Sequence, residues 1–106
     1  MYDGAFMPKG PTVLVGVNAV QAPNTDGTAP TSYRVRNILS TAQYMTWAPR
    51  TNSVPTITAT APSAATPAVN TMGFAAGSTE TVIFPPNCWF KADAVAAFEV
   101  TPGEGV

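Results

Sequence analysis

The sequence predicts an all-β fold, a small antiparallel β-sandwich or jelly-roll with an extended N-terminal arm. About six or seven short runs rich in valine, threonine and aromatic residues recur every ten residues or so, as in sandwiches and barrels. Proline, glycine and asparagine separate these runs and supply turn chemistry. No segment of helical length carries a convincing helical apolar period. The 106 residues therefore predict one sandwich domain at residues 12–106, preceded by an arm at residues 1–11.

The arm at residues 1–11 combines aromatic and apolar side chains with several glycines and prolines. This composition is too broken for a helix and too apolar for an unattached tail. We expect the arm to dock, either on a neighbouring molecule or on its own domain. The side chains expected to make that contact are Tyr2, Phe6 and Met7.

Residues 12–20 form the first predicted strand. Val13, Val15 and Val17 share one face, with Gly16 and Asn18 on the other, which is the period of two of a half-buried strand. Residues 21–31 consist of turn-forming types and predict a surface loop.

Residues 32–39 alternate again and predict a second strand. Tyr33 and Val35 face one side of it, so Arg34 and Arg36 share the opposite side.

Residues 42–48 predict a third strand, in which Trp47 is expected to anchor a core layer. Only Ser40 and Thr41 separate this strand from the preceding one. Such a short link favours a β-hairpin between the two strands.

Residues 51–69 are rich in proline, alanine and threonine and allow two interpretations. Alternate residues from Val54 onwards share a strand face, but Pro55 removes a backbone donor, so an edge strand is one of them. A flexible loop is the other, since the segment has little apolar area to offset the cost of ordering.

Three β-like runs at residues 80–84, 88–92 and 94–100 complete the chain. Phe98 and Val100 share one face of the last run. A helix over residues 91–98 is the competing prediction, because that stretch is rich in alanine.

The charged fraction is only 10%, against about 25% in typical soluble domains. This predicts a surface partly covered by other proteins, although a monomer kept soluble by threonine, serine and asparagine is an alternative.

A net charge of −1 with five cationic residues argues against nucleic-acid binding, which needs about one positive side chain per phosphate contact. No apolar stretch is long enough to span a bilayer, and the first ten residues lack a signal-peptide pattern, which favours a cytoplasm-like compartment.

Catalysis and metal binding are not expected. No histidine is present, so Cys88, the single cysteine, has no imidazole to take its proton and is interpreted as a small buried hydrophobe. The carboxylates are scattered, and none has the spacing of a calcium loop. The sequence thus predicts no enzyme and no cofactor. A sugar-binding surface at Trp47 or Trp89 is an alternative role for the aromatic residues.

Three segments form a set: YRVRNILSTAQYMTWAP at residues 33–49, GSTETVIFPPNCWFKA at residues 77–92 and AAFEVTPGEGV at residues 96–106. The set contains a strand that ends in asparagine, a Pro-Pro-Asn turn and a chain end of the form TPGEG. It resembles a family of small virion structural proteins of tailed bacteriophages, chiefly in the second half of the chain. The resemblance rests on pattern and on the chain ending.

The resemblance implies a β-sandwich or jelly-roll component of a phage particle, made in the bacterial cytoplasm and assembled into the virion. It implies no enzymatic residues. Our leading hypothesis is a capsid decoration or cement protein, a homo-oligomer that binds the major capsid protein or another virion protein and stabilises the head shell. A neck, tail or fibre-associated component is the first alternative, and a carbohydrate-binding module is the second.

The partner interface is expected at the two ends of the chain, where the arm and residues 101–106 would reach across to neighbouring molecules. The candidate interface residues are Tyr2, Phe6, Met7, Thr101, Pro102 and Val106.

Overall fold

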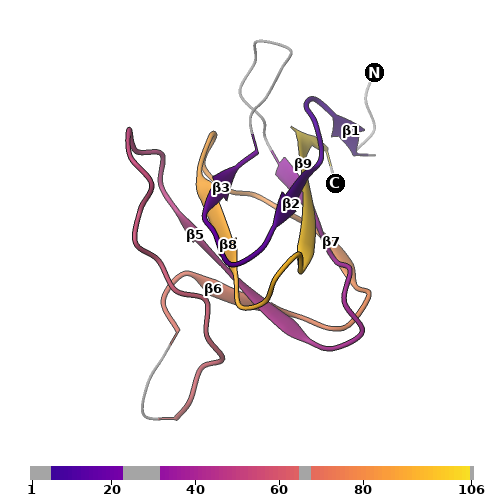
Figure 1. Cartoon of the computed structure of the whole chain (residues 1–106). Coiled ribbons are helices and arrows are strands. Elements are labelled where there is room, and N and C mark those ends of the chain that lie inside the picture. Colours follow the sequence, from indigo (N-terminus) through magenta and orange to yellow (C-terminus); the bar gives the residue numbers. More distant parts are fainter. Residues whose placement is uncertain (1–5, 23–31, 65–67, 106) are drawn as a thin grey trace.

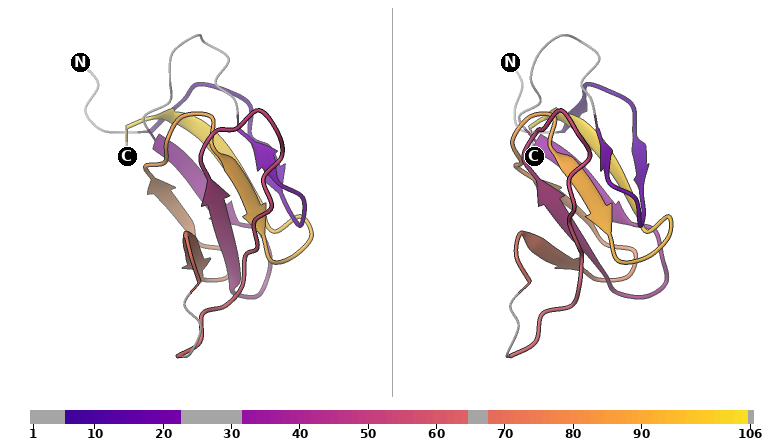
Figure 2. Two further views of the ribbon diagram at one scale, coloured as in Figure 1. Left: turned by 90° about the vertical axis from the view of Figure 1, so that its left-hand side faces the viewer. Right: turned by 60° about the vertical axis from the view of Figure 1, so that its left-hand side comes forward.

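A computed structural model describes residues 6–22, 32–64 and 68–105, which contain nine strands and no helix. Two antiparallel sheets pack face to face (Figures 1 and 2), which confirms the predicted all-β class and a small β-sandwich. The strands are β1 (Met7–Pro8), β2 (Val13–Val15), β3 (Val20–Gln21), β4 (Ser32–Asn37), β5 (Gln43–Ala48), β6 (Thr71–Phe74), β7 (Thr79–Val82), β8 (Trp89–Ala92) and β9 (Phe98–Glu104).

Sheet A has the order β1-β9-β4-β7, and β2 also pairs with β9, beside β1 on the same edge. Sheet B has the order β3-β8-β5-β6. The alternation in β4 follows the predicted pattern, with Tyr33 and Val35 fully buried and Arg34 and Arg36 exposed on the outer face. Burial of the apolar set on one face fixes the register of β4 between its neighbours.

Aromatic side chains dominate the core between the sheets. Tyr33, Phe90 and Phe98 have no exposed surface. The Phe84 ring lies 5.1 Å from that of Phe90 and 5.8 Å from that of Tyr33, centroid to centroid, in edge-to-face geometry. Such pairs stabilise a core beyond the area they bury. Trp47 is partly buried and packs against this core from β5, as predicted.

The predicted hairpin between the second and third strands is wrong. β4 belongs to sheet A and β5 to sheet B, so the chain crosses from one sheet to the other between Asn37 and Gln43. The Asn37 side chain is fully buried. It donates to the Thr41 carbonyl within this crossing and to the Phe74 carbonyl at the end of β6 in sheet B. A two-residue hairpin would leave that amide without these partners.

The predicted strand at residues 12–20 is two strands. β2 pairs with β9 in sheet A, whereas β3 pairs with β8 in sheet B. The chain changes sheet at Gly16, where an added Cβ would lie 2.8 Å from the Ala96 nitrogen. Val17 is therefore 45% exposed and does not share the buried face of Val15.

The last predicted run begins and ends later than expected. Residues 94–97 form a turn, with Ala96 at φ 51°, and β9 runs on to Glu104. The helix over residues 91–98 is absent, because β8 and this turn occupy it. The predicted face is correct, since Phe98 and Val100 are both buried.

Residues 51–64 contain no strand and cross the outer side of sheet B (Figure 2). Thr46 and Ala48 point away from the core, yet they are only 3% and 7% exposed. Ala59 is buried as well, so this excursion covers the outer face of β5. The short strands β1 and β6 were not expected from the sequence.

Candidate functional site

Residues 6–11, the part of the arm that the structure describes, lie on their own domain along the edge of β9. β1 pairs Met7 with Glu104 and Pro8 with Gly103, while β2 pairs Val13 with Val100 (Figure 1). Residues 9–12 of the edge therefore face only Thr101 and Pro102, which makes a bulge with two extra residues. Bulges of this kind interrupt pairing and bend the strand.

Pro102 explains the position of the bulge. Its carbonyl accepts a 2.9 Å hydrogen bond from the Lys9 N–H. The nitrogen and the carbonyl of a strand residue face the same neighbour, so the missing Pro102 N–H also faces the arm. In a regular ladder an N–H at position 102 would donate a hydrogen bond to the arm, which proline cannot do. The bulge places no regular pairing at this position, so that bond is not required.

The arm packs against Gly103, Arg34 and Glu104, which together we call the Gly103 socket. A Cβ on Gly103 would lie 2.5 Å from Phe6 Cζ and would also clash with the Met7 carbonyl oxygen. The Arg34 guanidinium lies 4.6 Å from the centroid of the Phe6 ring, a cation–π contact. Lys9 Nζ lies 3.5 Å from a Glu104 carboxylate oxygen. The arm is thus held by an aromatic ring, a short ladder and an ion pair.

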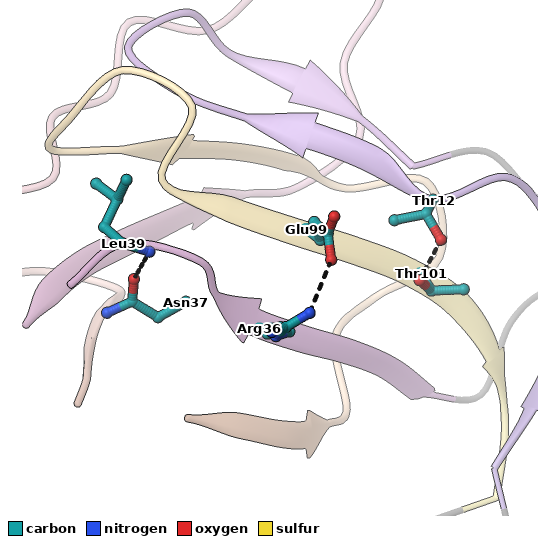
Figure 3. Close-up of polar contacts among 6 residues, drawn as sticks. All are labelled: Thr12, Arg36, Asn37, Leu39, Glu99 and Thr101. Carbon is teal, nitrogen blue, oxygen red and sulfur yellow. Dashed lines mark hydrogen bonds and ion pairs between the residues drawn. The ribbon is translucent and has the colours of Figure 1, made fainter. Parts of the chain in front are cut away.

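Two further polar contacts lie on the outer face of sheet A (Figure 3). The hydroxyls of Thr12 and Thr101 are 2.7 Å apart, and Arg36 lies 3.8 Å from Glu99. Both side chains of that ion pair are more than a third exposed, so solvent screening leaves it a small effect on stability.

The predicted interface residues fall into two groups. Phe6, Met7, Thr101 and Pro102 come together at the junction of arm and β9. Pro102 is buried and Met7 is 45% exposed. Tyr2 and Val106 lie outside the described residues.

Gly103 and Glu104 lie within the expected segment 101–106, but the sequence did not single them out as interface residues. A Pro-Gly pair next to the end of a β-like run was the available signal, since glycine inside a strand often marks close approach of another chain segment.

An apolar hollow of about 240 Å³ lies at the end of the sandwich where β2 leaves sheet A. Leu14, Val17 and Val95 border it and are 54%, 45% and 72% exposed. Its other lining residues are uncharged too. Exposed apolar surface in one place is typical of a protein contact site.

The two tryptophans proposed for sugar binding differ in environment. Trp47 borders a hollow of about 330 Å³ together with Thr56, Thr58 and Asn70, and its ring lies 6.0 Å from that of Phe84. The Trp89 indole N–H is buried without a hydrogen-bond partner in the described structure. Trp47 therefore borders a hollow that also offers hydroxyl and amide groups.

The Pro-Pro-Asn turn is tied to β4 by Tyr33. The Tyr33 hydroxyl donates to the Pro85 carbonyl at 3.4 Å and accepts from the Asn87 N–H at 3.2 Å. Burial raises the pKa of Tyr33 to about 12, with a smaller contribution from Cys88. Burial likewise raises the pKa of the Cys88 thiol to about 12. Cys88 is fully buried, as predicted, and is protonated at neutral pH.

These raised pKa values predict loss of stability in alkali. The unfolded chain releases the two protons near the ordinary pKa values of 9.0 and 10.0, whereas the folded chain holds them to higher pH. Stability should be complete below about pH 9 and fall as pH rises towards about 12, by at most about 1.4 kcal/mol per pH unit per group. Urea unfolding at a series of pH values measures the slope. Cys88→Ala and Tyr33→Phe should each flatten it; an unchanged slope in the double variant would contradict the assignment.

No three side chains of the metal-binding types His, Cys, Asp and Glu gather together among residues 6–22, 32–64 and 68–105. The same residues include no helix able to cross a membrane. Comparisons of the chain with protein-family models, with curated proteins and with solved structures found no match.

Proposed function

We propose that this chain is a structural protein of a tailed-phage particle, a decoration or cement protein that binds the head shell as a homo-oligomer. The observation that carries the proposal is the uncharged hollow with Leu14, Val17 and Val95 exposed around it. Covering exposed apolar surface is favourable by about 25 cal/mol per Å². A module of this kind gains stability when it packs against another protein.

The charge distribution supports the same role. Five cationic and six anionic residues leave a net charge of −1. Copies packed side by side on a shell therefore repel each other little. Many weak contacts add up when each copy touches several neighbours, because attachment of one site raises the effective concentration of the next.

The motifs behind the phage resemblance have structural roles in this chain. Asn37 ends β4 at the crossing between sheets, Asn87 is held by Tyr33, and Gly103 receives the arm. The resemblance therefore supports a shared sandwich, and the apolar hollow supports an assembly role. The partner is the major capsid protein or another virion protein, and the location is the virion, assembled in the bacterial cytoplasm.

Particle binding tests the proposal. Quantitative mass spectrometry of purified particles should give on the order of hundreds of copies, as expected for a shell-covering protein. Val95→Asp should reduce attachment at least about tenfold, because burying an unpaired carboxylate is costly. Val54→Asp is the matched control, since Val54 is 64% exposed but lies in the excursion after β5.

Other outcomes favour other roles. A fixed number of roughly a dozen copies or fewer would indicate a neck or tail component, because such structures have few equivalent positions. Absence from particles, or equal attachment of the Val95→Asp variant, would contradict the proposal.

Sugar binding beside Trp47 is a second candidate, favoured by the hollow that Trp47 shares with threonine hydroxyls. We rank it below assembly because Trp47 is partly buried and packs on the core through Phe84.

A further inference from the structure

We propose that the arm is exchanged between copies, so that Phe6–Lys9 of one chain occupies the Gly103 socket of a second copy. The inference rests on the homo-oligomer in the proposed function and states how one copy holds the next. Exchange of an identical element is a low-cost route to assembly, because the same contacts form in both states.

The arm can be exchanged as a unit. Its described contacts are with β9 and with Arg34 of β4, both parts of sheet A. Those elements pair with each other along Ser32–Gly103 to Asn37–Phe98 without the arm. The socket therefore exists before the arm arrives.

The bulge provides a hinge. Residues 10–12 connect Lys9, the last residue bonded in the socket, to β2 and belong to neither strand. Three residues reach about 10 Å when extended. This length allows the arm to cross to an adjacent sheet edge but not to a distant one, so exchange requires two copies to meet edge to edge.

Complementary groups identify a second copy as the occupant. The arm carries the cation Lys9 and the socket carries Glu104, at 3.5 Å. The Phe6 ring occupies the space that a Cβ on Gly103 would need. The arm of a second copy carries both groups and therefore fits this site.

Exposed apolar side chains on both sides of the hinge favour a neighbour there. Met7 is 45% and Leu14 54% exposed, although both lie in strands paired with β9. When the β1–β2 edges of two copies lie side by side, each covers Met7 and Leu14 of the other. The exchanged arms also form the same contacts with the Gly103 socket as in the monomer. Exchange thus gains apolar burial that the folded monomer lacks.

Cross-linking of the unmodified chain tests the exchange. A carbodiimide joins Lys9 to Glu104 as an amide, because the two groups already touch. Chains labelled with ¹⁴N and ¹⁵N are mixed in equal amounts, unfolded, refolded together and cross-linked. Exchange predicts mixed labels in about half of the Lys9–Glu104 cross-links, from random assortment of copies. Lys9→Gln should remove this cross-link and thereby verify its assignment.

Same-label cross-links only would overturn the exchange. If sedimentation then shows an oligomer, the self-assembly in the proposed function survives without it. If sedimentation shows a monomer, the self-assembly fails as well.

A second measurement needs no refolding. Met7 and Glu104 are opposite partners in an antiparallel pair, and such partners are close enough for a disulfide. Met7→Cys combined with Glu104→Cys should give covalently linked chains on a denaturing gel after oxidation. Closure within single chains would contradict the exchange.

Discussion

Replacement of Asn37 by alanine is expected to lower the free energy of unfolding by roughly 3 kcal/mol. The Asn37 Nδ2 group donates to the carbonyls of Thr41, Phe74 and Ala75 at 3.0, 3.1 and 3.2 Å. Its Oδ1 accepts from the Leu39 N–H at 2.9 Å (Figure 3). The variant removes all four bonds at a fully buried site, although the Ala75 carbonyl still accepts from the N–H and the hydroxyl of Ser78.

The size of the effect follows from the total stability. Domains of this size are stable by about 5–15 kcal/mol, so a loss of this size is a large fraction. The melting temperature should fall by roughly 10–20 °C. Calorimetry or urea unfolding measures it, and Asn52→Ala, at an exposed position in the excursion, should change stability by less than about 0.5 kcal/mol.

Asn37→Asp separates the donor from the acceptor. The carboxylate keeps the bond from Leu39 but faces three carbonyl oxygens with no hydrogen to donate. This variant should be at least as unstable as Asn37→Ala at neutral pH. A loss below about 1 kcal/mol in both variants would mean that solvent replaces the network.

Asn37 also shows what the sequence could predict. Tyr33 and Val35 set the inward face of β4, and the same alternation puts Asn37 inward. A buried amide at a strand end indicates a backbone partner, but nothing local says that the partners are Phe74 and Ala75, far along the chain. The hairpin was therefore predicted from a short link, whereas long-range hydrogen bonds favour the crossing to sheet B.

The alternation of apolar and polar residues was sufficient to predict a strand and its buried face where burial alone determines the structure. The runs around Tyr33 and Phe98 bury alternate side chains, and their faces were predicted correctly. β6 was missed because its sequence, TMGF, contains a glycine that looks like a breaker. That glycine, Gly73, lies under the Tyr44 ring, where an added Cβ would be 2.9 Å from Tyr44 Cε2. Packing from a neighbouring strand determines this residue, and only the fold reveals it.

The candidate site was predicted in part. The arm residues Phe6 and Met7 and the chain-end residues Thr101 and Pro102 were selected for different reasons, and the structure places them at one junction. The sequence could not place the arm on β9, because the pairing depends on a bulge around Pro102. Whether these contacts form within one chain or between copies is the question that the exchange proposal answers.

Gly103→Ala should release the arm. The added methyl group would meet both Phe6 and the Met7 backbone, and backbone cannot move aside without breaking the β1 ladder. Loss of the ladder, the cation–π contact and the ion pair should cost about 2 kcal/mol. Trypsin cleavage after Lys9 should become at least about tenfold faster, because the arm no longer has to detach from β9 before the protease can bind it.

A truncated chain lacking residues 1–8 separates this mechanism from backbone strain. Both groups that the methyl would meet are then gone, so Gly103→Ala should cost less than about 0.5 kcal/mol there. Gly77→Ala is a contrasting control: its Cβ meets nothing within 4 Å, but φ is 70°, so its cost of about 1 kcal/mol comes from the backbone alone. An equal cost of Gly103→Ala in full and truncated chains would mean that Gly103 serves β9 itself. A cost that vanishes with the arm would mean that the chain keeps glycine here to receive another segment, whichever copy supplies it.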